Sequence, residues 1–295
     1  MVRTTGRTKG RARAFQSVKT TNTIITVTKY CVLILWAAFV LLPFFWVISS
    51  SLKDPTNVFR IPIQWIPIPA DFNNFVRVFT EFQFHRYIFN SAWLTTINII
   101  GFVISCTLVA YAFATQQWTH KNKLFLLVLA TMMLPREVIF YPRFILFRYL
   151  GWYGTMLPLW VPSLFADAFL IFLLRQFFLS VPTALGEAAT IDGCNRLQVF
   201  TKIYLPLSKP AMASAAIFVF MFHWNDFFGP LIFITQASLR TAALALFYLR
   251  GSMEIASLLP VQMAAALITS IPCIMVFAFL QRYFIAGIVI KGVEK

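Results

Sequence analysis

Six long apolar segments restrict the fold of this chain more than any other feature of its sequence. They lie at about residues 27–49, 90–114, 124–144, 156–174, 211–235 and 261–283. Each is close to the ~20 residues that an α-helix needs to cross the hydrocarbon core of a bilayer. A helix satisfies its backbone hydrogen bonds within one segment, which lipid surroundings require. We therefore expect an all-α polytopic membrane protein with six transmembrane helices.

The composition agrees with a membrane protein and argues against a nucleic-acid-binding one. Of the 295 residues, 59% are hydrophobic and only 12% are charged, whereas about a quarter of an average soluble domain is charged. The net charge of +15 by itself is compatible with nucleic-acid binding. However, the basic residues gather at the ends of apolar segments, where they orient membrane spans. We expect the lipid bilayer, and no nucleic acid, as a partner.

The basic residues also predict the topology. Residues 1–29 carry arginines and lysines and no acid, so we expect a disordered basic tail there, followed by a transmembrane domain over 30–295. Lys121 and Lys123 lie between the second and third spans. By the positive-inside rule, the tail and this turn face the cytoplasm, and six spans then place both termini there. Residues 50–89 form a proline-rich connection, and its part from 73 to 89 is typical of an interfacial helix.

The loop at 183–206 is the longest internal stretch unsuited to lipid. Thr183 is followed by small and apolar residues at helical spacing, which predicts a short capped helix with one apolar face. Gly193 supplies a stop signal for that helix. About three turns cannot cross a membrane. A short apolar face at the membrane surface is suited to a socket on another protein.

The same loop resembles the EAA loop of ABC-importer permeases. The matching positions, with no departure in spacing, are Glu187, Ala188, Ala189, Gly193, Ile203, Leu205 and Pro206. Further similarity lies in Asn90-Ser91, in Leu134-Pro135 and in the segment 224–227, which reads Trp-Asn-Asp-Phe. The resemblance covers about residues 30–295 and is strongest to the MalG-type carbohydrate uptake family.

This resemblance implies the fold, partners and location of the chain. The fold is that of an ABC type I importer permease, with the short helix seated in a cleft of an ATPase subunit. The implied assembly contains a second, different permease subunit, two ATPase subunits that bind ATP and Mg, and an extracytoplasmic solute-binding protein. The implied location is the bacterial cytoplasmic membrane.

The sequence itself gives no sign of catalysis. It contains no Gly-x-x-x-x-Gly-Lys-Ser/Thr phosphate loop, so we expect ATP hydrolysis in separate subunits. The three histidines, His85, His120 and His223, are far apart and show no metal-ligand spacing. We expect a transport subunit without cofactor, metal or catalytic residues.

Polar residues within the fifth span have two interpretations. His223, Trp224, Asn225 and Asp226 lie well inside this apolar segment, and ionisable groups within membranes are commonly functional. They therefore form a candidate lining of the substrate path. The alternative is a structural role, in which they join helices or cap a break before Pro230.

Arg136, Phe140 and Arg143 recur on one helical face of the third span. One interpretation is a surface for an anionic substrate such as an acidic oligosaccharide, because arginine forms bidentate pairs with carboxylates. The alternatives are a salt bridge to the partner permease and snorkelling of the arginines to lipid headgroups.

These observations lead to one preferred function and two rivals. We expect a permease subunit of an ATP-driven, binding-protein-dependent oligosaccharide importer that works by alternating access. The first rival is a permease for another solute class, such as glycerol phosphodiesters. The second is a membrane scaffold or enzyme that works without an ATPase partner.

Overall fold

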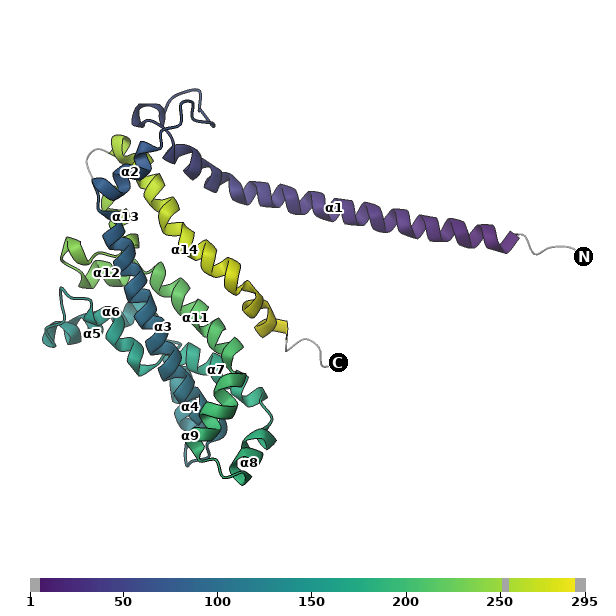
Figure 1. Cartoon of the computed structure of the whole chain (residues 1–295), viewed down its shortest axis with the longest axis vertical. Helices are drawn as coiled ribbons and strands as arrows, with labels where there is room; N and C mark the ends of the chain where they lie inside the picture. Colours follow the sequence, from purple (N-terminus) through teal and green to yellow (C-terminus); the bar gives the residue numbers. More distant parts are fainter. Residues whose placement is uncertain (1–5, 251–254, 290–295) are drawn as a thin grey trace, which may run out of the picture.

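The computed structural model describes the backbone of residues 6–250 and 255–289 and the side chains of 24–249, except Arg136, and of 258–281. The described residues form helices joined by turns and loops, with no strand among them (Figure 1). The helices are α1 (Gly6–Ser51), η1 (Pro55–Asn57), α2 (Asn73–Thr80), α3 (Phe84–Thr115), α4 (Lys121–Thr131), α5 (Arg136–Tyr149), α6 (Leu157–Trp160), η2 (Val161–Phe165), α7 (Ala168–Ser180), α8 (Thr183–Ile191), α9 (Arg196–Val199), η3 (Phe200–Tyr204), α10 (Leu205–Leu207), α11 (Lys209–Trp224), α12 (Phe228–Phe233), η4 (Ala237–Leu239), α13 (Ala242–Arg250) and α14 (Ile255–Val289).

The all-helical architecture was expected from the sequence, but the apolar segments are less regular than six straight spans. Four stretches are long and apolar enough to cross a bilayer: Ile24–Ser51, Phe84–Thr115, Leu157–Ser180 and Leu258–Gln281. A fifth is obtained when Arg196–Leu207 and Lys209–Trp224, which meet at 73°, are counted as one. This number is compatible with six spans, and the count of six stays a prediction.

Three of the expected spans are interrupted. The third divides into α4 and α5 around Leu134-Pro135, because proline disfavours helical backbone in the residue before it. The fourth is interrupted at Ala166, whose φ of 65° is incompatible with a continuous helix. The fifth stops at Trp224 and resumes as α12 at Phe228. Each break exposes helix ends within an apolar segment.

The body of the molecule is built around α3, which packs against both α7 and α11. At one end of α3, aromatic side chains of α3, α7 and η3 pack together. The Tyr111 ring lies 4.8 Å from the Phe200 ring and 5.2 Å from the Tyr204 ring, measured between centroids. At the other end of α3, Asn90 Nδ2 donates to the carbonyl oxygens of Ser238 and Arg240 at 2.8 and 2.9 Å. The Asn-Ser pair at 90–91 therefore ties α3 to the segment leading into α13.

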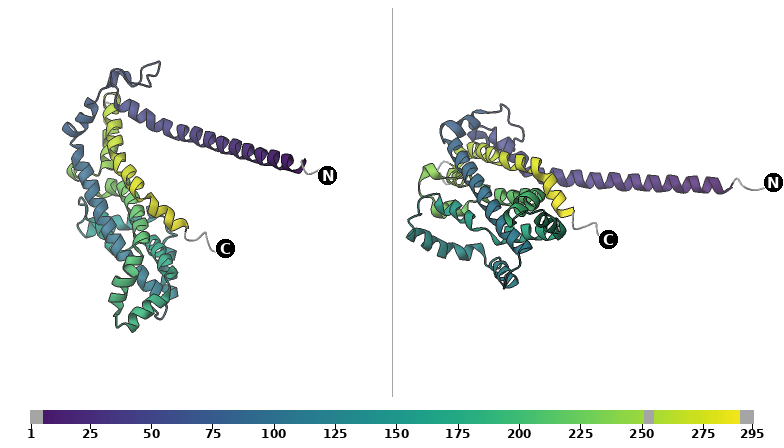
Figure 2. Two further views of the ribbon diagram at one scale, coloured as in Figure 1. Left: turned by 45° about the vertical axis from the view of Figure 1, so that its right-hand side comes forward. Right: turned by 60° about the horizontal axis from the view of Figure 1, so that its bottom comes forward.

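The first helix stands away from this body, as Figures 1 and 2 show from three directions. No part of its most apolar window within Ile24–Ser51 is buried, and its main helix contact is with α14 near one end. The expectation of a disordered tail over 1–29 was wrong from Gly6 onward, because α1 begins there. Residues 6–23 contain no proline, and their two alanines, three arginines and two lysines favour helix.

Candidate functional site

The short helix expected at 183–193 is present as α8, and its end is well defined. Gly193 has a φ of 85°. Its N–H donates to Thr190 O at 3.1 Å, and Cys194 N–H donates to Ala189 O at 3.0 Å. These two bonds form a Schellman motif, which requires a left-handed residue at the position of Gly193. At the other end Thr183 is not the cap: it is the first helical residue, and Pro182 precedes it without a side-chain cap bond.

The two faces of α8 differ in what they contact. Gly186 and Ala189 are buried against the rest of the chain. Leu185, Ala188 and Ile191 lie on the outward side, and 87% of the Ile191 side chain is exposed. The adjacent alanines of the motif therefore have different surroundings: Ala189 packs inside this subunit, whereas Ala188 belongs to a free apolar stripe. Glu187 is also exposed on the outward side.

The second half of the motif forms a bulged turn. Phe200–Tyr204 is one turn of π-helix, in which Leu205 N–H donates to Phe200 O. Pro206 lies within α10 and has no N–H, so it cannot donate the regular bond to the carbonyl four residues before it. Ile203 and Leu205 are half-buried against the aromatic core, and Pro206 is exposed. These residues position the loop on the body of the subunit.

Two residues missed by sequence reasoning hold α8 in place. A Cβ atom built on Gly186 would lie 3.2 Å from Tyr204 Oη and 3.3 Å from Tyr204 Cε2, so only glycine allows this approach without movement. Burial raises the pKa of the Tyr204 phenol, with smaller effects from Tyr111 and Glu187, which keeps it neutral. The sequence signal that could have identified this contact is Gly186 itself, which directly precedes the Glu-Ala-Ala triplet.

Basic residues fasten α7, the helix before the loop, to the end of α3. Arg175 Nε donates to Phe113 O at 3.2 Å, and its guanidinium lies 4.0 Å from the centre of the Phe125 ring. Lys121 Nζ donates to Gln116 O at 2.7 Å. Cations at the C-terminal end of a helix satisfy its free carbonyls and interact favourably with its dipole. Three helices, α3, α4 and α7, are thereby joined next to the loop.

A cavity of about 420 Å³ lies at the other end of α7 and α11. Four of the residues expected in a substrate path line it: Phe140, Arg143, His223 and Asp226. The interrupted helices bring them together, because the wall includes the start of α7 and the break between α11 and α12. Asp167 and Asn98 also line the cavity and were not identified from the sequence.

The two carboxylates in this wall accept hydrogen bonds at the starts of the helices that follow the breaks. Asp167 Oδ1 accepts from the N–H groups of Phe169 and Leu170 at 3.0 and 3.2 Å, which caps the start of α7. Asp226 Oδ1 accepts from Gly229 N–H at 3.1 Å in the first turn of α12. The positive end of each helix dipole offsets part of the carboxylate charge.

The other residues expected in the path have different positions. Trp224 is buried away from the cavity, with Nε1 donating to Thr269 O of α14 at 3.1 Å. Asn225 Nδ2 donates to Met221 O at 2.8 Å and closes the end of α11. Arg136 is the first residue of α5, and its side chain is outside the described part of the structure.

Aromatic rings form much of the rest of the cavity wall. His223 stacks on Phe102 with ring centroids 5.6 Å apart, and the Arg143 guanidinium lies 6.0 Å from the centre of the Phe140 ring. Rings of this kind can stack on the apolar faces of sugars, and Arg143 can pair with an anion. Within the described residues, no three His, Cys, Asp or Glu side chains are grouped so that they could hold a metal ion.

Comparisons with known proteins identify the family. Residues 24–289 match the family of binding-protein-dependent transport system inner membrane components. The arabinooligosaccharides transport system permease protein AraQ of Halalkalibacterium halodurans is 32% identical over 84% of this chain and 88% of its own length. The sn-glycerol-3-phosphate transport system permease protein UgpE of Yersinia enterocolitica is 32% identical over 88% of this chain and 94% of its own.

The fold agrees with this assignment. A crystal structure of a bacterial ABC transporter involved in the import of the acidic polysaccharide alginate contains a chain with 24% identity and a TM-score of 0.78, covering 90% of this chain and 98% of that one. The similar proteins are permease subunits, which are not enzymes themselves. The chain is therefore a multi-pass permease subunit of an ABC importer and belongs to the family of binding-protein-dependent transport system inner membrane components.

Proposed function

We propose that this subunit forms part of an oligosaccharide path and that motion reaches this path from ATPase subunits through the loop at 183–206. One observation carries the proposal. Helices α7 and α11 both run from the cavity to this loop: Phe169 and His223 line the cavity, while Ser180 and Lys209 flank the loop. A displacement of α8 is thus connected to the cavity wall by two helices of this subunit.

The outward side of α8 supports docking on an ATPase subunit. Leu185, Ala188 and Ile191 present an apolar stripe that the described residues of this chain do not cover. The ATPase subunits bind ATP and Mg, and closure of the pair moves the docked helices. The spans then alternate between outward-facing and inward-facing arrangements, which is a rigid-body switch.

The first helix supports an assembly with a second, different permease subunit. The apolar window of α1 is unburied within this chain, so another protein or lipid must surround it. An extracytoplasmic solute-binding protein delivers the substrate at the end opposite to α8. In this arrangement the protein resides in a bacterial cytoplasmic membrane with both termini in the cytoplasm, as the basic residues at Lys121 and Lys123 indicate.

The cavity supports an acidic oligosaccharide as substrate. Arg143 adds a cation to the cavity wall. The negative charges of Asp167 and Asp226 in the same wall are partly offset by the backbone N–H groups that they accept at helix starts. Aromatic rings around it, including Phe102 and Phe140, are suited to sugar faces. The names of AraQ and of the alginate importer refer to saccharides, the latter to an acidic one.

Glycerol phosphate compounds are the second candidate class. UgpE is as similar to this chain as AraQ, and its name refers to sn-glycerol-3-phosphate. Arg143 can pair with a phosphate as readily as with a carboxylate. Of the two classes, only the oligosaccharide has sugar rings. The aromatic wall of the cavity favours it for that reason.

Uptake by the complete transporter tests the proposal. Proteoliposomes holding both permeases and the ATPases, supplied with binding protein, are offered a uronate oligosaccharide, a neutral arabino-oligosaccharide and glycerol-3-phosphate in turn. Arg143→Gln should lower uptake of the uronate about tenfold or more, because a hydrogen bond to a charged group contributes about 1.5–3 kcal/mol. Arg148→Gln on the same helix is the control, since Arg148 is exposed outside the cavity.

Three outcomes would contradict parts of the proposal. Equal losses in the two arginine variants show that α5 has a general role and that Arg143 does not contact substrate. Uptake of the neutral sugar alone removes the acidic class, and uptake of glycerol-3-phosphate alone selects the second candidate. Co-purification of the ATPase subunits with each variant verifies that the transporter has assembled.

A further inference from the structure

The loop at 59–70 has an unusual surface for a connection outside the spans. Its large apolar side chains are exposed, with 90% of Ile61 and 78% of Ile68 accessible. The exposed set is Phe59, Ile61, Ile63, Trp65, Ile66 and Ile68. No charged residue occurs between Arg60 and Asp71. Figure 1 shows this loop beside the end of α1 at which the helix joins the body.

Trp65 seats the loop on the last turns of α1. The Trp65 ring lies 5.6 Å from the Trp46 ring and 6.5 Å from the Phe45 ring, between centroids. Ser49 Oγ donates to Trp65 O at 2.5 Å. Phe45 and Trp46 precede the end of α1 at Ser51 by five to six residues, which corresponds to roughly 8–9 Å along a helix. The loop therefore folds back along a helix that crosses the membrane.

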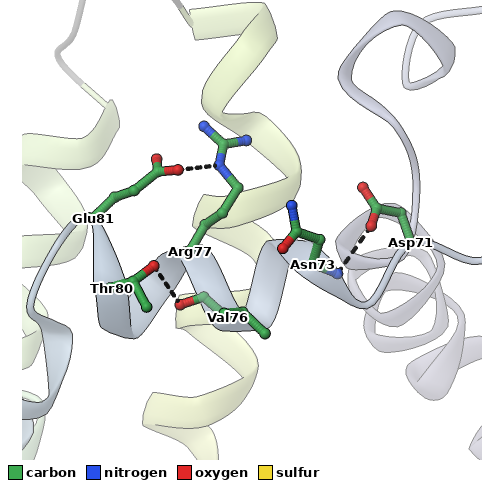
Figure 3. Close-up of polar contacts among 6 residues, drawn as sticks. All are labelled: Asp71, Asn73, Val76, Arg77, Thr80 and Glu81. Atoms are coloured by element: carbon green, nitrogen blue, oxygen red, sulfur yellow. Dashed lines mark hydrogen bonds and ion pairs between the residues drawn. The ribbon is translucent and has the colours of Figure 1, made fainter.

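The base of the loop carries the polar groups. Lys53 is buried, with its ammonium 4.1 Å from the centre of the Trp46 ring, and Asn74 Nδ2 donates to Lys53 O at 2.9 Å. Figure 3 shows the adjoining α2, where Asp71 Oδ1 accepts from Asn73 N–H and Arg77 pairs with Glu81. Apart from Arg60 at the start of the loop, charge and hydrogen bonding are thus concentrated at the base, and the exposed apolar side chains lie beyond it.

We propose that the 59–70 loop inserts its apolar side chains into the interfacial layer of the lipid leaflet at this end of α1. Tryptophan beside the end of a spanning helix is typical of that layer. A protein partner is less suitable, because protein interfaces carry about one hydrogen bond per 100–200 Å². Pro62, Pro67 and Pro69 remove three N–H groups from the loop, and Gln64 Nε2 donates to Ile68 O at 3.4 Å within it.

This membrane contact has a specific use in the molecule. Near Ser51, α1 contacts the body through α14 and through the bond from Asn74 Nδ2 to Ser51 O at 3.1 Å. A lipid-embedded loop stacked on Phe45 and Trp46 fixes the depth of that end in the bilayer. The contact does not depend on the substrate or on the ATPase subunits, so it is independent of the proposed function.

Quenching of a fluorescent probe in the reconstituted transporter tests the proposal. An environment-sensitive fluorophore is attached at Ile68→Cys, with the native cysteines replaced, and is challenged with spin-labelled lipid or with aqueous iodide. Thr56→Cys is the matched control, because Thr56 is exposed in the polar segment just before the loop. We expect lipid to quench the probe at 68 at least threefold more strongly than the probe at 56, and iodide to show the reverse order.

Two results would overturn the proposal. Equal quenching by iodide at 68 and 56 places the loop in water. Protection of position 68 from both quenchers places it under a protein subunit. A second variant, Trp65→Ala, removes the stacking on α1 and should reduce lipid quenching at 68 while the yield of assembled transporter is retained. Unchanged lipid quenching in that variant contradicts the seating of the loop by Trp65.

Discussion

Replacement of Gly193 tests whether the loop at 183–206 must keep its shape to bind an ATPase subunit. A Cβ atom built at this position meets no atom within 4 Å, while φ is 85°. A substitution therefore acts through the backbone conformation and not through a collision inside the subunit. Left-handed backbone costs an ordinary L-residue about 1–2 kcal/mol, and a β-branched residue is a stronger outlier there.

This cost predicts the size of the effect. Gly193→Val should disfavour the Schellman turn by about 1–2 kcal/mol, which is a factor of roughly 5–30 in an equilibrium. Gly193→Asn is the matched control, because asparagine is similar in size to valine and is the residue after glycine most often found at this position. ATPase subunits are titrated onto the purified permease pair, and the apparent Kd is measured for each variant.

The order of the three affinities decides the question. The glycine and asparagine forms should bind the ATPase subunits similarly, and the valine form about 5–30-fold more weakly. Equal weakening by valine and asparagine would show that side-chain volume against the ATPase matters, and not φ. Undiminished binding by the valine form would refute the claim that this turn positions the docking helix.

Three further predictions concern the packing around the cavity and the loop. A Cβ atom on Gly101 would collide with Ser163 Oγ, so Gly101→Ala should destabilise the subunit by about 1–3 kcal/mol, and adding Ser163→Gly should restore the Tm of the purified complex; no recovery would argue against this contact. Arg175→Ala should lower ATP-driven uptake while membrane insertion stays normal. Arg175→Lys should retain only part of the uptake, because lysine lacks the planar group that stacks on Phe125. Full uptake in the lysine variant would show that only the charge of Arg175 matters. Trp224→Phe should lose the bond to Thr269 O and lower stability by about 1 kcal/mol, measured as Tm, without changing substrate preference; a changed preference would place Trp224 in the substrate path after all.

The predictions that agree with the structure rest on signals within short stretches of the sequence. The helix at 183–191 and its end at Gly193 are encoded within one short stretch, in which the left-handed turn needs a glycine. The breaks in the third and fourth spans were not predicted, because hydropathy averages over a window and does not register a single residue such as Ala166. The break before Pro230 was one of two interpretations of the polar residues in the fifth span. The π-helical turn at Phe200–Tyr204 was similarly hidden, although Pro206, which lacks an N–H, follows it closely.

The direction of side chains depended on contacts that the sequence does not contain. His223 and Trp224 are neighbours, yet His223 lines the cavity while Trp224 donates to α14. A periodicity argument can place both on a helix, but it cannot decide which face meets which neighbour. Gly186 was overlooked for the same reason, since its partner Tyr204 lies on another element.

The contact between α1 and α14 has a consequence for how this protein is made. The first helix ends at Ser51, the last begins at Ile255, and they pack together near one end of the molecule. At a synthesis rate of ~5–20 residues per second, the roughly 200 intervening residues take about 10–40 s to emerge from the ribosome. Throughout that time the newly inserted α1 has no α14 to pack against.

The same delay applies to the neighbouring elements, because η1 and α2 also contact α14. Val78 of α2 is completely buried in a cluster that includes Val261 and Ala264 of the last helix. Until α14 has been synthesised and inserted, α1, η1 and α2 must therefore contact lipid, the insertion machinery or another subunit instead. A ribosome stalled before residue 255 would leave a chain whose first helices are inserted but whose tertiary structure is still open to membrane proteases.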